Sequence, residues 1–136
     1  MTDPIRLLLA DDQQMVRAGF RLVLDAQPDM SVVGEANDGA EAVQLVDELA
    51  PDVVLMDIRM PVLDGLGATE KIMTGHPEAK ILVLTTFDLD EYVHSALRAG
   101  ASGFMLKDAG LTELLAAIRA VRDGDSVVAP SATRRL

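Results

Sequence analysis

Cysteine is missing from this 136-residue chain, and aromatic residues make up only 3% of it. Without cysteine no disulfide can form, which is compatible with the reducing cytoplasm, the compartment we expect for this protein. With so few aromatic rings, the core has to be aliphatic, built from Leu, Val, Ile, Ala and Met. No apolar stretch approaches the roughly 20 residues of a membrane-spanning helix, and no basic-then-apolar signal sequence opens the chain.

Positive charge is also scarce. There are 12 Lys and Arg residues against 22 Asp and Glu residues, which gives a formal net charge of −10. Nucleic-acid binding normally requires a basic patch, so we do not expect these residues to bind DNA themselves. The acidic excess favours recruitment of a divalent cation instead. The length fits one domain, and 49% hydrophobic with 25% charged residues is an ordinary globular mixture.

What the chain does contain is a regular alternation of apolar runs with amphipathic segments. The apolar runs predict buried strands over residues 5–10, 31–35, 53–57, 80–86 and 102–107. Each run is followed by apolar residues at helical spacing, and the five predicted helices end near Pro28, Pro51, Gly75, Gly100 and Gly124. Strands that alternate with helices in this way imply a parallel sheet with right-handed crossovers and helices on both faces.

The predicted helices carry recognisable start signals and core faces. Asp38 with Glu41 three residues later resembles a capping box, and Asp88 can cap the fourth helix. The fifth helix is expected to face the core with Leu111, Leu114, Ile118 and Val121. Its further apolar residues leave open a second use, as a surface for a partner.

Polar side chains stand where four of the five predicted strands end. The first strand is followed by Asp11 and Asp12, and the third, fourth and fifth strands end with Asp57, Thr85 and Lys107. The carboxyl ends of parallel strands share one rim, where open α/β sheets hold their ligands. Three carboxylates meeting there would repel, by about 4 kcal/mol for a pair ~4 Å apart at an effective dielectric near 20.

A divalent cation would relieve that repulsion. Mg²⁺ prefers one or two carboxylates together with waters and phosphate oxygens. Lys107 adds a positive charge and Thr85 a hydroxyl donor, so the set suits a phosphoryl group arriving on Asp57. Taken singly, each residue has a plainer explanation that the sequence leaves open: Asp11 and Asp12 could cap the first helix, Thr85 could bond to backbone, and Lys107 could be solvated.

The order and spacing of these residues resemble the receiver domain of bacterial two-component response regulators, over about residues 4–124. The resemblance rests on four stretches: Leu9-Ala10-Asp11-Asp12, residues 56–65, Leu84-Thr85-Thr86, and residues 100–108. It implies a flavodoxin-like (βα)5 fold, a doubly wound parallel sheet with strand order 2-1-3-4-5. The domain division it implies is a receiver over residues 1–124, followed by the start of an interdomain linker over residues 125–136.

The resemblance also implies residue roles. Asp57 would be the phosphoacceptor. Asp12 and Asp57 would bind Mg²⁺ together with the backbone carbonyl of Arg59, and Asp11 would bind it through water. Lys107 would pair with the phosphoryl group or with the Asp57 carboxylate.

Two further residues would report phosphorylation. Thr85 would bond a phosphoryl oxygen and vacate space, and Phe104, which resembles the family's switch aromatic, would turn inward to fill that space. The alternative is that Phe104 is simply a core residue. Arg59 and Phe87 are expected to flank the approach of water, which would make the aspartyl phosphate long-lived.

The function implied is a phosphorylation-controlled switch that accepts its phosphoryl group from a sensor histidine kinase and is not a turnover enzyme. The phrase Val16-Arg17-Ala18-Gly19-Phe20 and the Lys107-Asp108 ending are similar to the NarL/FixJ subfamily, whose members carry a LuxR-type helix-turn-helix. That subfamily suggests phosphorylation-favoured homodimers through the first and fifth helices. It also suggests DNA binding only through a C-terminal domain absent from these residues. A stand-alone receiver that acts by protein–protein interaction is the alternative.

One departure and two rival classes complete the comparison. Many receivers place a cis proline after the lysine, whereas this chain has Asp108, and a cis non-proline bond costs ~3 kcal/mol, so the isomer is left open. A haloacid-dehalogenase-type hydrolase would need a second Asp two positions after the nucleophile, where this chain has Arg59. A flavodoxin-like cofactor binder would need a Gly- or Ser/Thr-rich phosphate loop where Asp11 and Asp12 stand.

Overall fold

The computed structural model describes residues 3–86 and 90–128. Phe87, Asp88 and residues 129–136, on which some of the expectations above depend, lie outside the described residues. Within the described part, the strands form one parallel sheet. They are β1 (Ile5–Ala10), β2 (Met30–Ala36), β3 (Val53–Asp57), β4 (Ile81–Thr85), β5 (Gly103–Leu106) and β6 (Val127–Val128), in the order β2-β1-β3-β4-β5-β6.

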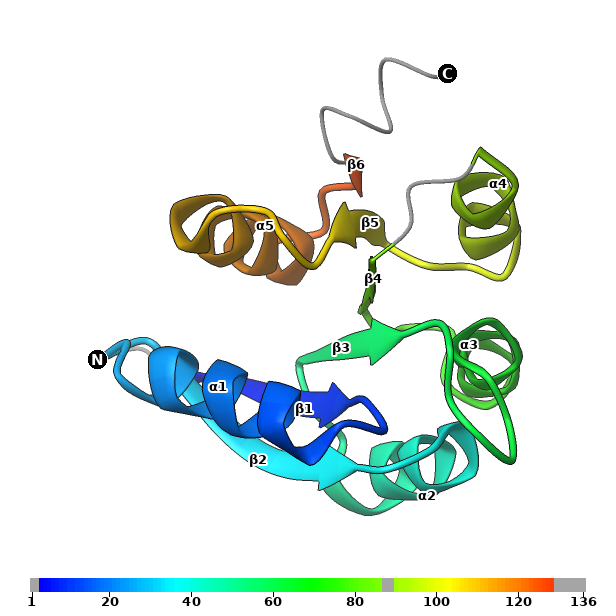
Figure 1. The fold of residues 1–136 in the computed structure, drawn as a ribbon, viewed down its shortest axis with the longest axis horizontal. Helices are drawn as coiled ribbons and strands as arrows, with labels where there is room; N and C mark the ends of the chain where they lie inside the picture. Colours follow the sequence, from blue (N-terminus) through cyan, green and yellow to red (C-terminus); the bar gives the residue numbers. More distant parts are fainter. Residues whose placement is uncertain (1–2, 87–89, 129–136) are drawn as a thin grey trace.

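Helices cover both faces of this sheet. They are α1 (Gln14–Asp25), α2 (Gly39–Leu49), α3 (Gly65–Gly75), α4 (Asp90–Arg98) and α5 (Leu111–Arg122). Figure 1 shows α1 and α5 on one face and α2, α3 and α4 on the other. The parallel sheet with helices on both faces, predicted from the alternation, is therefore confirmed, as are the flavodoxin-like fold and the strand order 2-1-3-4-5 that the resemblance implied. The order reverses at β1 and β3, which is where such sheets bind ligands.

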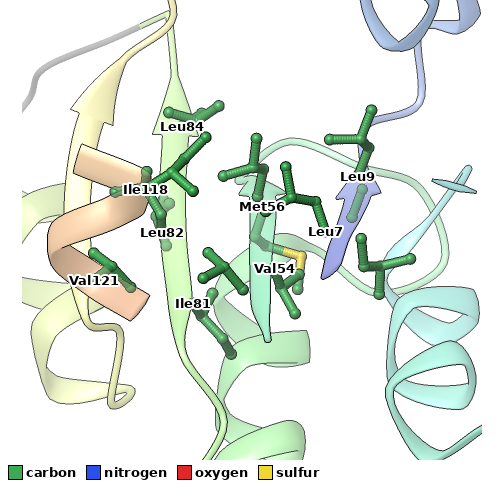
Figure 2. Packing of buried hydrophobic residues seen from close by; sticks show 14 of the residues in the cluster. Leu7, Leu9, Val54, Met56, Ile81, Leu82, Leu84, Ile118 and Val121 are labelled. Carbon is green, nitrogen blue, oxygen red and sulfur yellow. The ribbon is translucent and has the colours of Figure 1, made fainter. Parts of the chain in front are cut away.

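The core lies between the sheet and its two helical layers. Every residue of β3 and β4 is buried, as expected of strands covered on both faces. Figure 2 shows Ile118 of α5 packed beside Leu82 and Leu84 of β4. No helix in the described residues is long and apolar enough to cross a membrane.

Local sequence signals fix the start of the helices behind the sheet. Asp38 accepts a hydrogen bond from the backbone N–H of Glu41 at 2.8 Å, and Asp64 accepts one from Gly67 at 2.8 Å. These caps satisfy N–H groups that have no partner within the helix. Gly65 begins α3 so close to β3 that a Cβ would stand 1.9 Å from the Asp57 carbonyl oxygen. Only glycine allows this approach, which brings the loop after β3 back against the strand end.

Three features differ from the sequence-based expectations or add to them. The short strand β6 extends the sheet beyond β5 and had not been predicted. Leu111 is 44% exposed, so its assignment to the core face of α5 was wrong, whereas Leu114, Ile118 and Val121 are buried as predicted. Leu111 stands at the first position of α5, where the helix has only begun to cover the sheet. The peptide bond between Lys107 and Asp108, left open above, is trans.

Candidate functional site

The register of the two central strands brings the predicted carboxylates together. Ala10 of β1 pairs with Met56 of β3, so Asp11 and Asp57 follow as neighbours at the carboxyl ends of adjacent strands. Asp11, Asp12 and Asp57 each offer an oxygen atom, and these atoms lie within 4.8 Å of one another. Asp11 and Asp57 are only 5% and 8% exposed, whereas Asp12 is exposed. The cluster thus has two oxygens set into the sheet rim and one facing solvent.

The first helix does not use these carboxylates as caps. Its N-cap residue is Gln13, which makes no side-chain capping bond. Asp11 instead accepts a hydrogen bond from the Gln13 backbone N–H at 2.9 Å, which closes a tight turn and holds the carboxylate over the rim. The plainer explanation of this pair, helix capping, is therefore excluded.

Lys107 reaches the carboxylates from the end of β5. Its Nζ donates to Asp11 Oδ2 at 2.6 Å and lies 3.4 Å from Asp57 Oδ2. The backbone N–H of Lys107 donates to the Thr85 carbonyl at 2.8 Å, which fixes where the side chain starts. The lysine therefore bridges the two carboxylates, and its closer contact is with Asp11.

Burial and charge compete at this rim. Burial raises the pKa of Asp57 from 3.8 to about 6, opposed by the charge of Lys107 and reinforced by the charge of Asp11. For Lys107, burial lowers the pKa, but the hydrogen bond that it donates to Asp11 and the charges of Asp57 and Asp11 outweigh burial, so the pKa is raised above its usual range. The lysine is therefore positively charged at neutral pH, and burial makes the Asp57 carboxylate easier to protonate than an ordinary aspartate.

The remaining predicted residues surround this cluster. Thr85 is 2% exposed at the end of β4, and Phe104 on β5 is 0% exposed, so its ring is already fully inside the core. The exposed side chain of Arg59 donates from one terminal guanidinium nitrogen to the Tyr92 hydroxyl on α4 at 3.3 Å. Together with Asp12, Arg59 and Tyr92 line an open cavity of about 500 Å³ beside the carboxylates. Tyr92 had not been singled out from the sequence.

A second residue that sequence reasoning missed is Arg17. It is buried on α1, and it donates from Nη1 to the Asp11 backbone carbonyl at 2.5 Å. The signal was available, since Arg17 stands seven residues before the buried Leu24 and so on the core face of the helix. It had been noted only as part of the subfamily phrase.

The donor set fits a hard divalent cation. Three carboxylates within 4.8 Å, two of them buried, would carry unrelieved negative charge that one lysine only partly compensates. Oxygen ligands of this kind, with room for water on the Asp12 side, are what Mg²⁺ binds. Asp11, Asp12 and Asp57 are the residues that could hold the ion.

Comparison with known proteins agrees with this geometry. The profile of the response regulator receiver domain matches residues 7–119. The chain is 50% identical over 125 residues to the transcriptional regulatory protein YxjL of Bacillus subtilis, a match that covers 92% of this chain and 57% of YxjL. It is also 50% identical over 125 residues to the oxygen regulatory protein NreC of Staphylococcus aureus, covering 91% of this chain and 58% of NreC.

The fold has a close counterpart among solved structures. A LuxR-family two-component response regulator from Aurantimonas sp. superposes with a TM-score of 0.93 at 35% identity, over 97% of this chain and 94% of that one. The chain spans less than three-fifths of the length of the two curated relatives, 57% and 58%.

Proposed function

This chain belongs to the response regulator receiver domain family, and from that membership we propose that Asp57 is its phosphoacceptor and that Mg²⁺ binds at Asp11, Asp12 and Asp57. A receiver domain is a regulatory switch rather than a turnover enzyme. The observation that supports the assignment most strongly is the juxtaposition of three carboxylates within 4.8 Å with a lysine 3.4 Å from Asp57.

The chain's residues divide the work of phosphoryl transfer between them. Asp57 uses a carboxylate oxygen to attack the phosphorus, and the bond from phosphorus to the donor breaks. Lys107, already between Asp11 and Asp57, offsets negative charge on the incoming oxygens, and the Thr85 hydroxyl donates to one of them. The backbone carbonyl of Arg59 would complete the cation ligands, and Asp11 would act through water. When bound, Mg²⁺ supplies positive charge that positions the phosphoryl oxygens, which is the main catalytic requirement of this reaction.

A small phosphodonor tests the assignment directly. The protein is incubated with Mg²⁺ and acetyl phosphate, and intact-mass spectrometry follows the gain of one acid-labile phosphoryl group. Asp57→Asn should abolish the gain, and Asp123→Asn, at the exposed end of α5, serves as the matched control that keeps it. Full modification of Asp57→Asn, or modification of the wild type in EDTA, would contradict the assignment.

We propose that a sensor histidine kinase is the donor in the cell, and that the domain works in the cytoplasm as the regulatory part of a transcriptional regulator. Support comes from the relatives, because YxjL is named a transcriptional regulatory protein and NreC an oxygen regulatory protein, and the match covers only 57% and 58% of their lengths. DNA would then be bound by a separate C-terminal domain outside residues 1–136, joined by a linker to the sheet, whose last described strand is β6 (Val127–Val128). Promoter binding by the full-length protein but not by this chain, even at low salt, tests the division of labour.

We further propose that phosphorylation favours a homodimer through α1 and α5. An open apolar cavity lies between these helices, lined by Val16, Phe20, Leu111 and Leu114 among others. Met15, which also lines this cavity, is 88% exposed, and Leu22 elsewhere on α1 is 75% exposed, which is unusual for large apolar side chains. Sedimentation with beryllofluoride, which mimics the phosphoryl group, should give a dimer that Leu22→Glu abolishes. A monomer at high protein concentration and physiological salt would contradict this surface.

A further inference from the structure

The buried Arg17 lies behind the carboxylate cluster and takes no part in the function proposed above. It is 7% exposed and sits on the core face of α1, a position normally held by an apolar residue. A buried guanidinium is costly unless its donors are satisfied. The contacts that satisfy it here point in two directions, one toward the cluster and one away from it.

Toward the cluster, Arg17 binds the backbone rather than a carboxylate. Its Nη1 donates to the carbonyl oxygen of Asp11 at 2.5 Å, in a buried contact. That carbonyl belongs to the peptide group that joins Asp11 to Asp12. Because a peptide group is planar, a hydrogen bond to its oxygen restricts the orientation of the whole group, including its bond to the Cα atom of Asp12. That orientation in turn governs the direction in which the Asp12 side chain projects. Since the Asp12 side chain is exposed, this peptide is a principal constraint on it.

Away from the cluster, Arg17 is anchored to the edge of the sheet. Its Nε donates to Glu35 of β2 at 3.0 Å. Glu35 is itself held by Arg21 at 2.6 Å, and Arg21 lies 3.4 Å from Asp25. Arg17, Glu35, Arg21 and Asp25 thus form a chain of two cations and two anions. The Arg17 guanidinium is held by the Asp11 carbonyl on one side and by Glu35 on the other, and nearby anions balance its charge.

We propose that Arg17 is a positioning residue for the cation site: it holds the Asp11–Asp12 peptide in the orientation that presents the Asp12 carboxylate to the ion. The inference rests on the Mg²⁺ site proposed above. Outer partners that orient metal ligands typically change metal affinity by about 10–100-fold when they are removed. We expect about a tenfold loss of Mg²⁺ affinity in Arg17→Met.

The sign of the change separates positioning from simple electrostatics. Removing a cation near a site for Mg²⁺ reduces repulsion and should tighten binding. Releasing the Asp11–Asp12 peptide should weaken binding. Weaker binding therefore cannot be explained by the lost charge. It also cannot be explained by general destabilisation, provided that the variant is folded under the conditions of the titration.

The experiment measures the Mg²⁺ dissociation constant by NMR titration of the backbone amides around Asp12, in parallel with thermal unfolding. Arg17→Met removes the guanidinium, and Arg17→Lys keeps the charge with one ammonium that cannot bridge both the Asp11 carbonyl and Glu35. Arg119→Met is the matched control, because Arg119 makes a similar two-bond pair with Asp29, at 2.8 and 3.0 Å, at the amino end of the sheet. All three variants are expected to lower the unfolding temperature, but only the Arg17 variants should weaken Mg²⁺ binding.

A second readout follows phosphorylation by acetyl phosphate as a function of Mg²⁺ concentration. The Arg17 variants should need more Mg²⁺ for half-maximal rate and approach the wild-type rate when Mg²⁺ saturates. Unchanged or tighter Mg²⁺ binding in Arg17→Met overturns the inference. If that variant does not fold, Arg17→Lys decides by the same criterion. If the wild type binds no Mg²⁺, both the proposed function and this inference are refuted. If the wild type binds Mg²⁺ normally, the Arg17 variants test the positioning role alone.

Discussion

Replacing Asp57 with asparagine is expected to stabilise the cation-free protein while abolishing phosphorylation. The reason is that Asp57 is 8% exposed within 4.8 Å of two other carboxylates. At an effective dielectric near 20, each of those neighbours repels it by at least about 3 kcal/mol, and Lys107 at 3.4 Å returns about 5 kcal/mol. The two carboxylates together thus repel Asp57 by at least about 6 kcal/mol, which Lys107 offsets only in part, and the cost of burying the carboxylate adds to the remainder.

The pKa of Asp57 gives the magnitude. Burial raises it from 3.8 to about 6, and each pKa unit corresponds to 1.36 kcal/mol, so ionised Asp57 costs up to about 3 kcal/mol at neutral pH. Because the cluster opens to water on one side, solvent screening reduces this, and we expect a gain of about 1–3 kcal/mol for Asp57→Asn. Asparagine keeps the shape of the side chain and an oxygen that can accept from Lys107.

The pH dependence has a definite sign. A carboxyl group with a raised pKa binds its proton more tightly in the folded state, so the wild type loses stability as the pH rises from about 4 to 6 and no further above that. Asparagine does not titrate. The advantage of Asp57→Asn should therefore be small at pH 4.5, grow through pH 6 and level off above pH 7.

Urea unfolding followed by far-UV circular dichroism in EDTA measures this at each pH. Asp123→Asn is the control for a surface aspartate and should change stability by less than about 0.5 kcal/mol. Added Mg²⁺ should stabilise the wild type more than Asp57→Asn, because the proposed cation site uses Asp57 as a ligand and forms only in the folded state. A variant that is less stable than the wild type at pH 7.5 in EDTA, or a gain that does not change with pH, would refute the reasoning.

Other consequences of the structure can be tested alongside. Beryllofluoride should shift the NMR ring signals of Phe104, and Thr85→Ala should remove that response. The reason is that a coupled movement requires the Thr85 hydroxyl to contact the group bound at Asp57. Unaltered Phe104 signals would speak against the coupling. Arg59→Ala should shorten the lifetime of the aspartyl phosphate, measured as loss of label after donor removal, because the side chain lines the open cavity beside Asp12 and is expected to flank the approach of water. An unchanged lifetime would exclude this role. Ile118→Ala should cost about 2–5 kcal/mol in urea unfolding because the side chain is 0% exposed, whereas Leu111→Ala, at 44% exposure, should cost far less; equal losses would contradict the packing of α5.

Much of this protein could be predicted from the sequence because its signals are local. A fully buried parallel strand is a continuous apolar run, and β1, β3 and β4 lie where such runs predicted them. Asp57 and Asp11 follow directly from that, since each stands at the end of a run. The capping aspartate Asp38 needs only the residues within one helical turn.

What the sequence could not decide was which groups meet across the sheet. Periodicity says that a residue faces the core, but it does not say what lies opposite. Leu111 fits the apolar spacing of α5, yet it is 44% exposed and lines the open cavity beside α1 instead of lying in the core. The strand β6 is too short to register as an apolar run, and only pairing with β5 makes it a strand.

The site itself illustrates the same limit. The sequence predicted that Lys107 would approach the carboxylates. It could not predict that Asp11 is a closer partner than Asp57, because this depends on strand register and on the length of the lysine side chain. From the sequence, Arg17 was noted only as part of the stretch Val16-Arg17-Ala18-Gly19-Phe20. The packing of α1 against the sheet is what buries its side chain between Asp11 and Glu35. Burial and charge pairing are properties of neighbours brought together from distant parts of the chain, so they were decided by the tertiary structure alone.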